Sequence, residues 1–398
     1  MTTVAIICEY NPFHNGHEYH INKIREEFGN DTAIVCIMSG NYTQRGEVAF
    51  MPKGERARCA IECGANLVLE LPFPFSSSSA EYFAKSGIKI ANSLGCVDFL
   101  SFGSESGNID ELYNAARIYL SDEFKRAFTA LSDKAVGYPQ KCEMAYKQID
   151  KASKLEFTSN NILAIEYIKA IIESNSKIKP HTVKRLGASY NSTKIGDYAN
   201  QSAAAIREAY CTSGIDSQKH LPKAVAGIIE NCERNGDIPC SVSNISSAII
   251  ANLRLNPSHR DEEFHDAGDG LYNRLQNLSF EASDVTTLLE LSETKNYTRA
   301  RIRRALLNIF FGVTSSDVKI LPRFTQVLGM DGIGMQILKR AGKSELKILT
   351  KPSDYGHFDS VELKQKLLSD RADSVFELTK PIPKHGKSSL TFTPYVKK

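Results

Sequence analysis

The sequence predicts an α/β fold in which a parallel sheet, covered by helices on both faces, is followed by a mainly α-helical C-terminal domain. Over the first hundred residues, short continuous apolar runs alternate with segments of helical periodicity, as in βαβ units. Beyond about residue 213, helical periodicity dominates. The 398 residues are 42% hydrophobic and 24% charged, an average globular composition that excludes a disordered or fibrous chain.

Four apolar runs in the N-terminal part predict buried parallel strands, at residues 4–8, 32–38, 66–71 and 98–102. Three segments between them have helical spacing, at residues 16–28, 52–63 and 80–94. Pro52 suits the first turn of a helix and Gly95 suits the position after its last turn. Because strands buried on both faces read as continuous apolar runs, we expect helices on each side of the sheet.

The middle of the chain predicts further helices and a domain boundary. Isoleucines recur at helical spacing over residues 161–173, a late strand is expected at 182–186, and a short helix at 203–210. Turn-forming residues at 211–222 suggest a boundary, so we expect a first domain of residues 1–213 and a second of 214–398. In the second, residues 285–291 and 297–311 predict the clearest helices. The proline-containing tail predicts a loose basic end or an edge strand.

Charge and cysteine content restrict the protein class. The formal net charge is +3, so the protein as a whole does not read as a polyanion binder. Nine cysteines, an odd number without a Cys-x-x-Cys pair, are typical of reduced thiols. No apolar run approaches the roughly 20 residues of a membrane span, and no secretory signal pattern precedes residues 4–8. We therefore expect a cytoplasmic protein that does not associate with membranes.

A histidine motif marks a site for phosphates. His14, Asn15, Gly16 and His17 follow the first predicted strand and open the first predicted helix. A helix N-terminus offers free N–H groups and a positive dipole end to an anion. Gly16 permits close approach of a ligand to the backbone, and two imidazoles can donate hydrogen bonds to phosphoryl oxygens. The carboxyl end of a strand is also where open α/β sheets bind ligands.

Other interpretations of this segment are weaker. His14, His17 and His20 recur at three-residue spacing, but a zinc site needs three or four converging ligands and no His-Glu-x-x-His helix is present, so we expect no metal site. His20 by itself suits packing or capping. The sequence contains no Gly-x4-Gly-Lys-Ser/Thr loop, and the Gly332-Ile333-Gly334 segment follows no expected strand and lacks a third glycine.

Beyond this motif, the chain resembles the tRNA(Met) cytidine acetate ligase family, which belongs to the HxGH-type nucleotidyltransferase superfamily. Residues 9–17 look like the start of that family, and further segments match in order: 39–46, 102–105, 160–163, 184–186, 202–207, 295–302 and 323–329. Two positions depart from its pattern, because Ser159 replaces a proline and Ala204 replaces a threonine. The threonine hydroxyl contact is therefore in doubt here.

The resemblance implies a fold, a reaction and a site. The fold would be a Rossmann-like nucleotidyltransferase domain. The reaction would activate acetate with ATP, with Mg²⁺ expected, and transfer the acetyl group to N4 of the wobble cytidine, position 34, of elongator tRNA(Met). His14 and His17 would be catalytic. The implied ATP contacts are Ile7, Cys8, Glu9, Tyr10, Asn11, Pro12, Phe13, His14, Asn15, Gly16, His17, Glu18, Tyr19, His20, Gly103, Asn160, Arg185, Leu186, Ser202 and Arg207.

A basic stretch predicts where RNA binds. Residues 294–348 hold eleven basic and three acidic side chains, and Arg299 and Arg303 are i,i+4 neighbours on the expected helix at 297–311. A basic stripe on an amphipathic helix suits a phosphate backbone, although a solvated helix face would look the same. Together with the family resemblance, we expect RNA contacts at Arg299, Arg303, Arg304, Lys339 and Arg340.

Two other functions share parts of this pattern. A small-molecule nucleotidyltransferase would use His14 and His17 but leaves the basic helical half without a role. A non-catalytic tRNA-binding protein with a relic nucleotide pocket would explain the basic half, but the intact His14, Gly16, His17 and Arg207 argue against a relic. The sequence carries no pattern for the acetate pocket, for reading the wobble base or for an oligomeric state.

Overall fold

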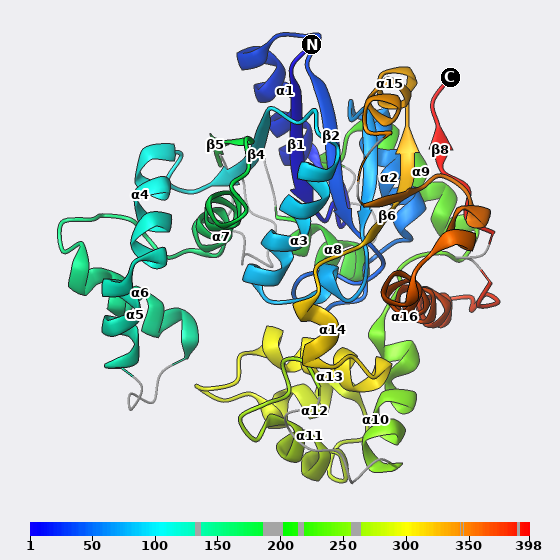
Figure 1. The fold of residues 1–398 in the computed structure, drawn as a ribbon. Coiled ribbons are helices and arrows are strands. Elements are labelled where there is room, and N and C mark those ends of the chain that lie inside the picture. Colours follow the sequence, from blue (N-terminus) through cyan, green and yellow to red (C-terminus); the bar gives the residue numbers. More distant parts are fainter. Residues whose placement is uncertain are drawn as a thin grey trace.

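A mixed sheet organises the part of the chain that the computed structural model describes (Figure 1), namely residues 1–131, 137–185, 202–213, 219–255, 264–342, 344, 346–387 and 391–398. The strand order is β5-β4-β1-β2-β3-β6-β7, with β8 also paired to β6. The strands are β1 (Thr3–Cys8), β2 (Ala33–Ser39), β3 (Leu67–Leu71), β4 (Phe99–Ser104), β5 (Lys179–Lys184), β6 (Phe324–Met330), β7 (Lys347–Leu349) and β8 (Tyr395–Val396).

The described helices separate into those that follow the sheet strands and those of the C-terminal half. The first group is α1 (Asn15–Phe28), α2 (Lys53–Glu62), α3 (Ala80–Ser93), α4 (Ile109–Leu120), α5 (Asp122–Thr129), α6 (Tyr138–Ile149), α7 (Ser159–Glu173) and α8 (Ala203–Ser213). The second is α9 (Lys223–Arg234), α10 (Ser246–Leu255), α11 (Leu271–Ser279), α12 (Val285–Ser292), α13 (Arg299–Phe311), α14 (Ser315–Lys319), α15 (Gly332–Arg340) and α16 (Ser360–Phe376). Short 3₁₀ helices are η1 (Phe75–Ser77), η3 (Val242–Ile245), η4 (Pro352–His357) and η5 (Glu377–Thr379).

The strand directions explain why the apolar runs are continuous. β1 to β5 are parallel to their neighbours, whereas β6 is antiparallel to β3. In β1, Ala5 and Ile7 face a core shared with α3 and α7, while Val4 and Ile6 face a second core shared with α1 and α2. Both faces of the strand are therefore buried, at about 1.5–3 kcal/mol per large apolar side chain. The predicted α/β fold class is confirmed.

Several element predictions need adjustment. The strand expected at 182–186 is β5, which begins earlier, at Lys179, and ends at Lys184, while Leu186 lies outside the described residues. The tail does contribute an edge strand, because β8 pairs with β6. β6 was not among the predicted strands, although residues 323–329 match the family.

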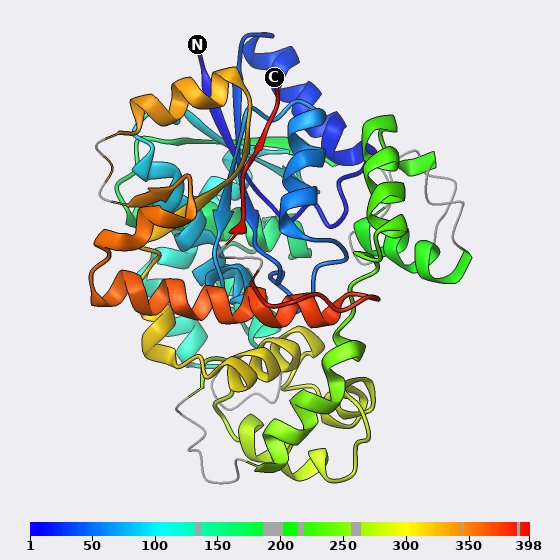
Figure 2. The same ribbon diagram turned by 90° about the vertical axis from the view of Figure 1, so that its right-hand side faces the viewer.

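Helices α10 to α13 form a third core, separate from the two that flank β1. Ile249, Leu271, Leu288, Ile302 and Leu306 pack together between α10, α11, α12 and α13. The long helix α16 lies between this group and the sheet, as Figure 2 shows. Its Phe376 joins an aromatic cluster with residues of the segment after β2 and of α13. The two groups of elements are thus packed against a common helix.

A buried ion network joins α16 to the N-terminal elements. The Lys53 Nζ of α2 donates to Glu70 Oε1 at 2.7 Å and to Asp373 Oδ2 at 2.6 Å. The Asn41 amide donates to the second Asp373 oxygen at 2.8 Å. All four side chains are buried, so residues more than 300 positions apart share one desolvated hydrogen-bond network.

The division into domains at residue 213 stays a prediction. The strand order bears on it, because β6, β7 and β8 come from residues after 213 and lie in the same sheet as β1 to β5. No helix within the described ranges has both the length and the apolar character needed to cross a membrane.

Candidate active site

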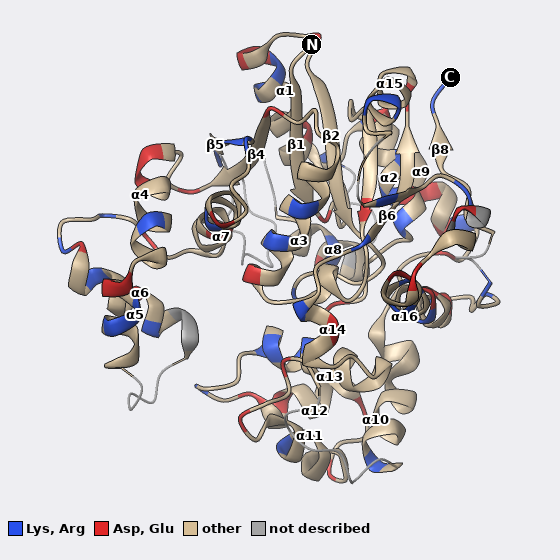
Figure 3. Ribbon diagram, viewed as in Figure 1, with Lys and Arg blue, Asp and Glu red and all other residues tan. Residues whose placement is uncertain are grey.

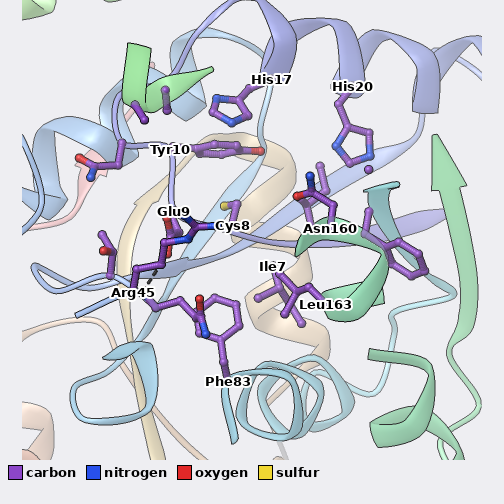
Figure 4. A pocket seen from close by; sticks show the side chains of 18 of the residues that line it. Ile7, Cys8, Glu9, Tyr10, His17, His20, Arg45, Phe83, Asn160 and Leu163 are labelled. Carbon is purple, nitrogen blue, oxygen red and sulfur yellow. Dashed lines mark hydrogen bonds between the residues drawn. The ribbon is translucent and has the colours of Figure 1, made fainter. Parts of the chain in front are cut away.

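A cavity opens at the carboxyl ends of β1 and β4, beside the first turn of α1 (Figure 4). It holds about 1230 Å³ with its mouth included. Its described wall consists of Ile6, Ile7, Cys8, Glu9, Tyr10, Asn11, His14, His17, His20, Thr43, Gln44, Arg45, Glu47, Phe83, Phe102, Gly103, Asn160, Leu163, Tyr167, Arg185, Ala203, Ala204 and Arg207. The wall combines apolar side chains with a small number of polar and charged ones, as in sites for small molecules.

The two histidines of the motif cap the helix that carries them. His14 is the N-cap of α1, and its Nδ1 accepts a hydrogen bond from the Gly16 amide at 3.0 Å. The His14 amide in turn donates to His17 Nδ1 at 3.2 Å. A neutral imidazole that accepts at Nδ1 carries its proton on Nε2. Both rings therefore keep an Nε2–H donor, and both line the cavity.

Burial keeps these histidines neutral. The His14 pKa is lowered to about 3, mainly by desolvation and further by the positive charges of Arg185 and His220. Burial also lowers the His17 pKa well below its usual value, with smaller contributions from His14 and Arg185. The ring centroids lie 3.8 Å apart, and Tyr10 packs beside His17. The site thus presents two fixed N–H donors rather than two permanent cations.

A glutamate and two arginines connect this cavity to helix α13. The Arg207 guanidinium of α8 donates to the Asn11 carbonyl at 2.7 Å and to Glu47 Oε2 at 2.9 Å. The other Glu47 oxygen accepts from Arg303 of α13. Ser202 holds the start of α8, because its Oγ accepts from the Ala205 amide at 3.0 Å. Arg207 is therefore positioned at the cavity by bonds from two directions.

The opposite wall comes from β4 and the start of α7. A side chain at Gly103 would meet the Arg185 side chain, since a Cβ there lies 3.2 Å from its Cγ. The Asn160 amide donates to Glu105 Oε1 at 2.5 Å, and the Asn160 side chain lies at the cavity wall (Figure 4). Ser159, which replaces the family proline, accepts from Arg45 at 3.2 Å.

The structure brings most of the expected ATP contacts together. Those that line the cavity are Ile7, Cys8, Glu9, Tyr10, Asn11, His14, His17, His20, Gly103, Asn160, Arg185 and Arg207. The cavity wall does not include Pro12, Phe13, Asn15, Gly16, Glu18, Tyr19 and Ser202. Among these, Phe13 is buried under His17, and Gly16 and Ser202 act through the caps of α1 and α8.

Other wall residues have no counterpart in the sequence-based site. They are Ile6, Thr43, Gln44, Arg45, Glu47, Phe83, Phe102, Leu163, Tyr167, Ala203 and Ala204. Thr43 and Gln44 lie in the segment that matches the family at 39–46, so that match was an available signal. Apolar residues such as Phe83 and Tyr167 look like ordinary core positions in a sequence.

The five expected RNA contacts do not form one surface. Arg303 and Arg304 are held by acidic partners, because Arg303 bonds to Glu47 and the buried Arg304 donates to Asp266 at 2.6 Å. Arg299 lies 3.8 Å from Glu293. Lys339 and Arg340 end α15, which lies at the other end of the molecule from α13 in Figure 3.

No group of three or more His, Cys, Asp or Glu side chains within the described ranges is arranged to hold a metal ion.

Comparison with known proteins identifies the family. Residues 1–389 match the family described as HIGH Nucleotidyl Transferase. The tRNA(Met) cytidine acetate ligase of Caldanaerobacter subterraneus subsp. tengcongensis is 36% identical, covering 89% of this chain and 90% of the relative. That of Acetivibrio thermocellus is 33% identical over 99% of both chains.

Solved structures agree with the sequence comparison. Crystal structures of Thermotoga maritima TmcAL, in the apo form and bound with alpha-thio ATP, match with TM-scores of 0.92 and 0.90. Both are 28% identical and cover 100% of this chain and 99% of theirs. With its motif at the first turn of α1 and relatives aligned along nearly its full length, the chain belongs to the HIGH nucleotidyl transferase family and, within it, to the tRNA(Met) cytidine acetate ligases.

Proposed function

We propose that this protein is an ATP-dependent ligase that activates acetate as acetyl-adenylate and transfers the acetyl group to N4 of the wobble cytidine, position 34, of elongator tRNA(Met). The observation that carries the proposal is family membership along nearly the whole chain. It is supported by a cavity that His14, His17 and Arg207 all line. The product on the tRNA is N4-acetylcytidine.

The first step needs charge stabilisation more than a strong base. An acetate oxygen attacks the α-phosphorus of ATP, and the bond to the bridging oxygen breaks as pyrophosphate leaves. Negative charge grows on the phosphoryl oxygens, where the Nε2–H groups of His14 and His17 and the N-terminus of α1 can donate hydrogen bonds. We assign Arg207 to the β- and γ-phosphates, because its side chain lines the same cavity as His14 and His17.

The second step transfers the acetyl group. The N4 amine of the cytidine attacks the acetyl carbonyl carbon, the bond to the adenylate oxygen breaks, and AMP leaves while the amine loses one proton. The contribution of the protein is positioning, which converts a bimolecular reaction into one within a complex. The same histidine donors stabilise the departing phosphate oxygens.

We further propose that Mg²⁺ accompanies the triphosphate. Glu9 and Glu47 supply carboxylates on the described wall, but Glu9 accepts from the Gln44 amide at 2.8 Å and Glu47 bonds to two arginines. Those carboxylates do not form a ready-made site for the ion.

We also propose a cellular location. A tRNA-modifying enzyme works where tRNA is found, so we place the protein in the cytoplasm.

The tRNA is proposed to approach from the α13 side. Arg299 and Arg303 lie on the helix that contacts the cavity through Glu47. Lys339 and Arg340 could contact only a more distant part of the RNA, and the bond of Arg304 to Asp266 favours a structural role.

The proposal is tested by acetate-dependent exchange between ATP and pyrophosphate, first without and then with tRNA. We expect exchange in the natural protein and a loss of about 10²–10³-fold when either His14 or His17 is replaced by Ala, the usual effect of removing one preorganised donor. His357→Ala, at an exposed position, is the matched control.

Labelled acetate and purified tRNA test the second step. Label should enter elongator tRNA(Met) at a cytidine and should not enter an initiator tRNA. Exchange without acetate would point instead to a small-molecule nucleotidyltransferase. RNA binding that ATP does not alter, together with no exchange, would point to a non-catalytic tRNA-binding protein.

A further inference from the structure

A chain of hydrogen bonds runs from the cavity wall to the surface of α1. His20 Nε2 lies 2.7 Å from Ser101 Oγ. The same hydroxyl lies 2.9 Å from His181 Nδ1, and His181 Nε2 lies 2.9 Å from Glu27 Oε2. His20 lines the cavity, whereas the Glu27 side chain is 59% exposed. No step of the proposed reaction yet uses Ser101, His181 or Glu27.

The fold places these four side chains together. Ser101 and His181 are direct partners in the register of β4 and β5, so they emerge on the same face of the sheet. His20 and Glu27 are seven residues apart on α1, two helical turns, and therefore lie on one face of the helix. Ser101 is completely buried between them and does not itself line the cavity.

With His181 in its neutral form, the partners determine the direction of every bond. The Glu27 carboxylate can only accept, so His181 donates from Nε2. In the neutral imidazole His181 Nδ1 must then accept, and the Ser101 hydroxyl donates to it. Ser101 has one proton to donate, so its oxygen accepts from His20 Nε2–H. His20 is consequently left with an unprotonated Nδ1, the reverse of the N–H donors that His14 and His17 present.

We propose that Glu27, His181 and Ser101 are positioning residues that hold His20 with Nδ1 as a hydrogen-bond acceptor for a donor group of the nucleoside part of ATP. This inference rests on the proposed function. An unprotonated nitrogen repels phosphate oxygens, which are also acceptors, whereas ribose hydroxyls and the adenine amino group are donors. His20 is one helical turn beyond His17, and its ring extends towards Asn160 (Figure 4).

Burial supports this arrangement. Desolvation is the largest cause that lowers the His20 pKa to about 3, and the neighbouring Arg185 guanidinium lowers it further. The ring therefore stays neutral at physiological pH, and only one nitrogen carries a proton. Which nitrogen carries it decides whether Nδ1 donates or accepts a hydrogen bond. A residue on the protein surface would thus set the hydrogen-bonding pattern inside the cavity.

The test replaces Glu27 by Lys, a side chain that can only donate. Lys would donate to His181 Nε2, and each bond of the chain would reverse, so that His20 carries its proton on Nδ1. Glu26→Lys is the matched control, because Glu26 is exposed on the same helix, pairs with Lys23 and changes the net charge equally.

Two readouts are measured on the full-length protein. Nitrogen-15 spectra of labelled histidine, assigned with His20→Gln, report which ring nitrogen is protonated. The KM for ATP is measured in acetate-dependent exchange. We expect Glu27→Lys to move the His20 proton to Nδ1 and raise KM about tenfold with little change in kcat, as for one lost hydrogen bond. Glu26→Lys should change neither.

A second pair of variants guards against a purely structural effect. Ser101→Ala breaks the chain and should also raise KM, while Ser101→Thr keeps a hydroxyl and should restore it. Exchange with 2′-deoxy-ATP, 3′-deoxy-ATP and inosine triphosphate identifies the donor, because the analogue that lacks it should lose its sensitivity to Glu27→Lys.

An unchanged His20 tautomer in Glu27→Lys, or a KM equal to that of the natural protein, would overturn the inference while exchange itself still supports the proposed function. The inference is also overturned if Glu27→Lys changes only acetyl transfer to tRNA and leaves exchange unchanged. The group that donates to His20 Nδ1 would then belong to the cytidine. Absence of exchange in the natural protein would count against the proposed function instead.

Discussion

His14, His17 and His20 have the same side chain and different chemistry, because their hydrogen-bond partners differ. Backbone amides donate to Nδ1 of His14 and His17 and leave Nε2–H on each ring. Ser101 occupies the Nε2 side of His20. Donors suit phosphates and an acceptor suits a nucleoside. The residue type therefore provides a ring that holds one proton, and the hydrogen-bond partner decides which ring nitrogen carries it.

Neutral buried histidines make stability depend on pH. The His14 pKa is lowered to about 3 in the folded protein, whereas an unfolded chain binds a proton near pH 6.5. Below that value the unfolded state binds more protons, so the free energy of unfolding falls as pH decreases from 6.5 towards 3. His14 alone should cost about 2 kcal/mol of stability at pH 5.

His14→Asn tests this at a single residue, because Asn keeps an N-cap acceptor and removes the titrating group. We expect the loss of unfolding free energy between pH 7 and pH 5, measured by urea denaturation, to be about 2 kcal/mol smaller in the variant. Equal losses in the two proteins would contradict the expectation.

At the scale of elements, α16 is held by charge as well as by apolar packing. Burial alone would lower the Lys53 pKa, but the neighbouring Asp373 and Glu70 raise it above its usual value. Burial raises the Glu70 pKa, opposed by Lys53. The lysine thus pairs with two acidic side chains, Glu70 of β3 and Asp373 of α16, and the position of α16 depends on a residue of α2.

Lys53→Met should therefore destabilise the protein by about 3–5 kcal/mol, because it leaves buried carboxylates without their counter-charge. Lys125→Met is the control: its ammonium pairs with Asp122 at the surface, 68% exposed, and its loss should cost less than about 1 kcal/mol. Urea denaturation at pH 7 measures both. Similar values for the two variants would show that the buried network contributes little.

The sequence predicts the elements whose pattern is local. β1 to β4 are continuous apolar runs, and α1 to α3 repeat apolar residues at helical spacing, so each is visible in a short window. The pairing of β6 with β3 is not local, because Val68 and Gly329 meet across the length of the chain. The sequence of neither segment indicates that it pairs with the other.

The same distinction applies to the site. Residues 14–17 form a recognisable motif because the groups that shape a helix N-terminus are neighbours in the sequence. Glu47 reaches the cavity from the segment after β2, and Leu163 and Tyr167 reach it from α7. Each looks like an ordinary loop or core position in the sequence. Family resemblance supplied Gly103, Asn160 and Arg185, which spacing alone does not distinguish.

At the scale of the whole molecule, the segment after β2 links the cavity to the helical C-terminal half. Glu47 bonds to Arg207 at the cavity and to Arg303 on α13. Gly46 has φ of +72°, and a Cβ there would lie 2.5 Å from the Arg304 amide nitrogen. Only glycine permits this contact, so the proposed ATP and tRNA surfaces share one rigid connection.

Glu47→Gln should strengthen ATP binding about fivefold, because it removes a negative charge beside the phosphates, an interaction worth about 1 kcal/mol in a well-hydrated site. Isothermal titration calorimetry measures the dissociation constant, with the exposed Glu26→Gln as control. Weaker binding in Glu47→Gln would mean that the carboxylate orients Arg207 for the phosphates instead of competing with them.

The pairing of β3 with β6 also has a consequence for synthesis on the ribosome. β3 ends at Leu71, and its partner begins at Phe324, so the edge of β3 has no partner while roughly 250 residues are translated. At 5–20 residues per second this takes about 13–50 s. An uncovered strand edge is a template for aggregation. During this interval the β3 edge of the nascent chain is therefore exposed, and chaperone binding there would prevent aggregation.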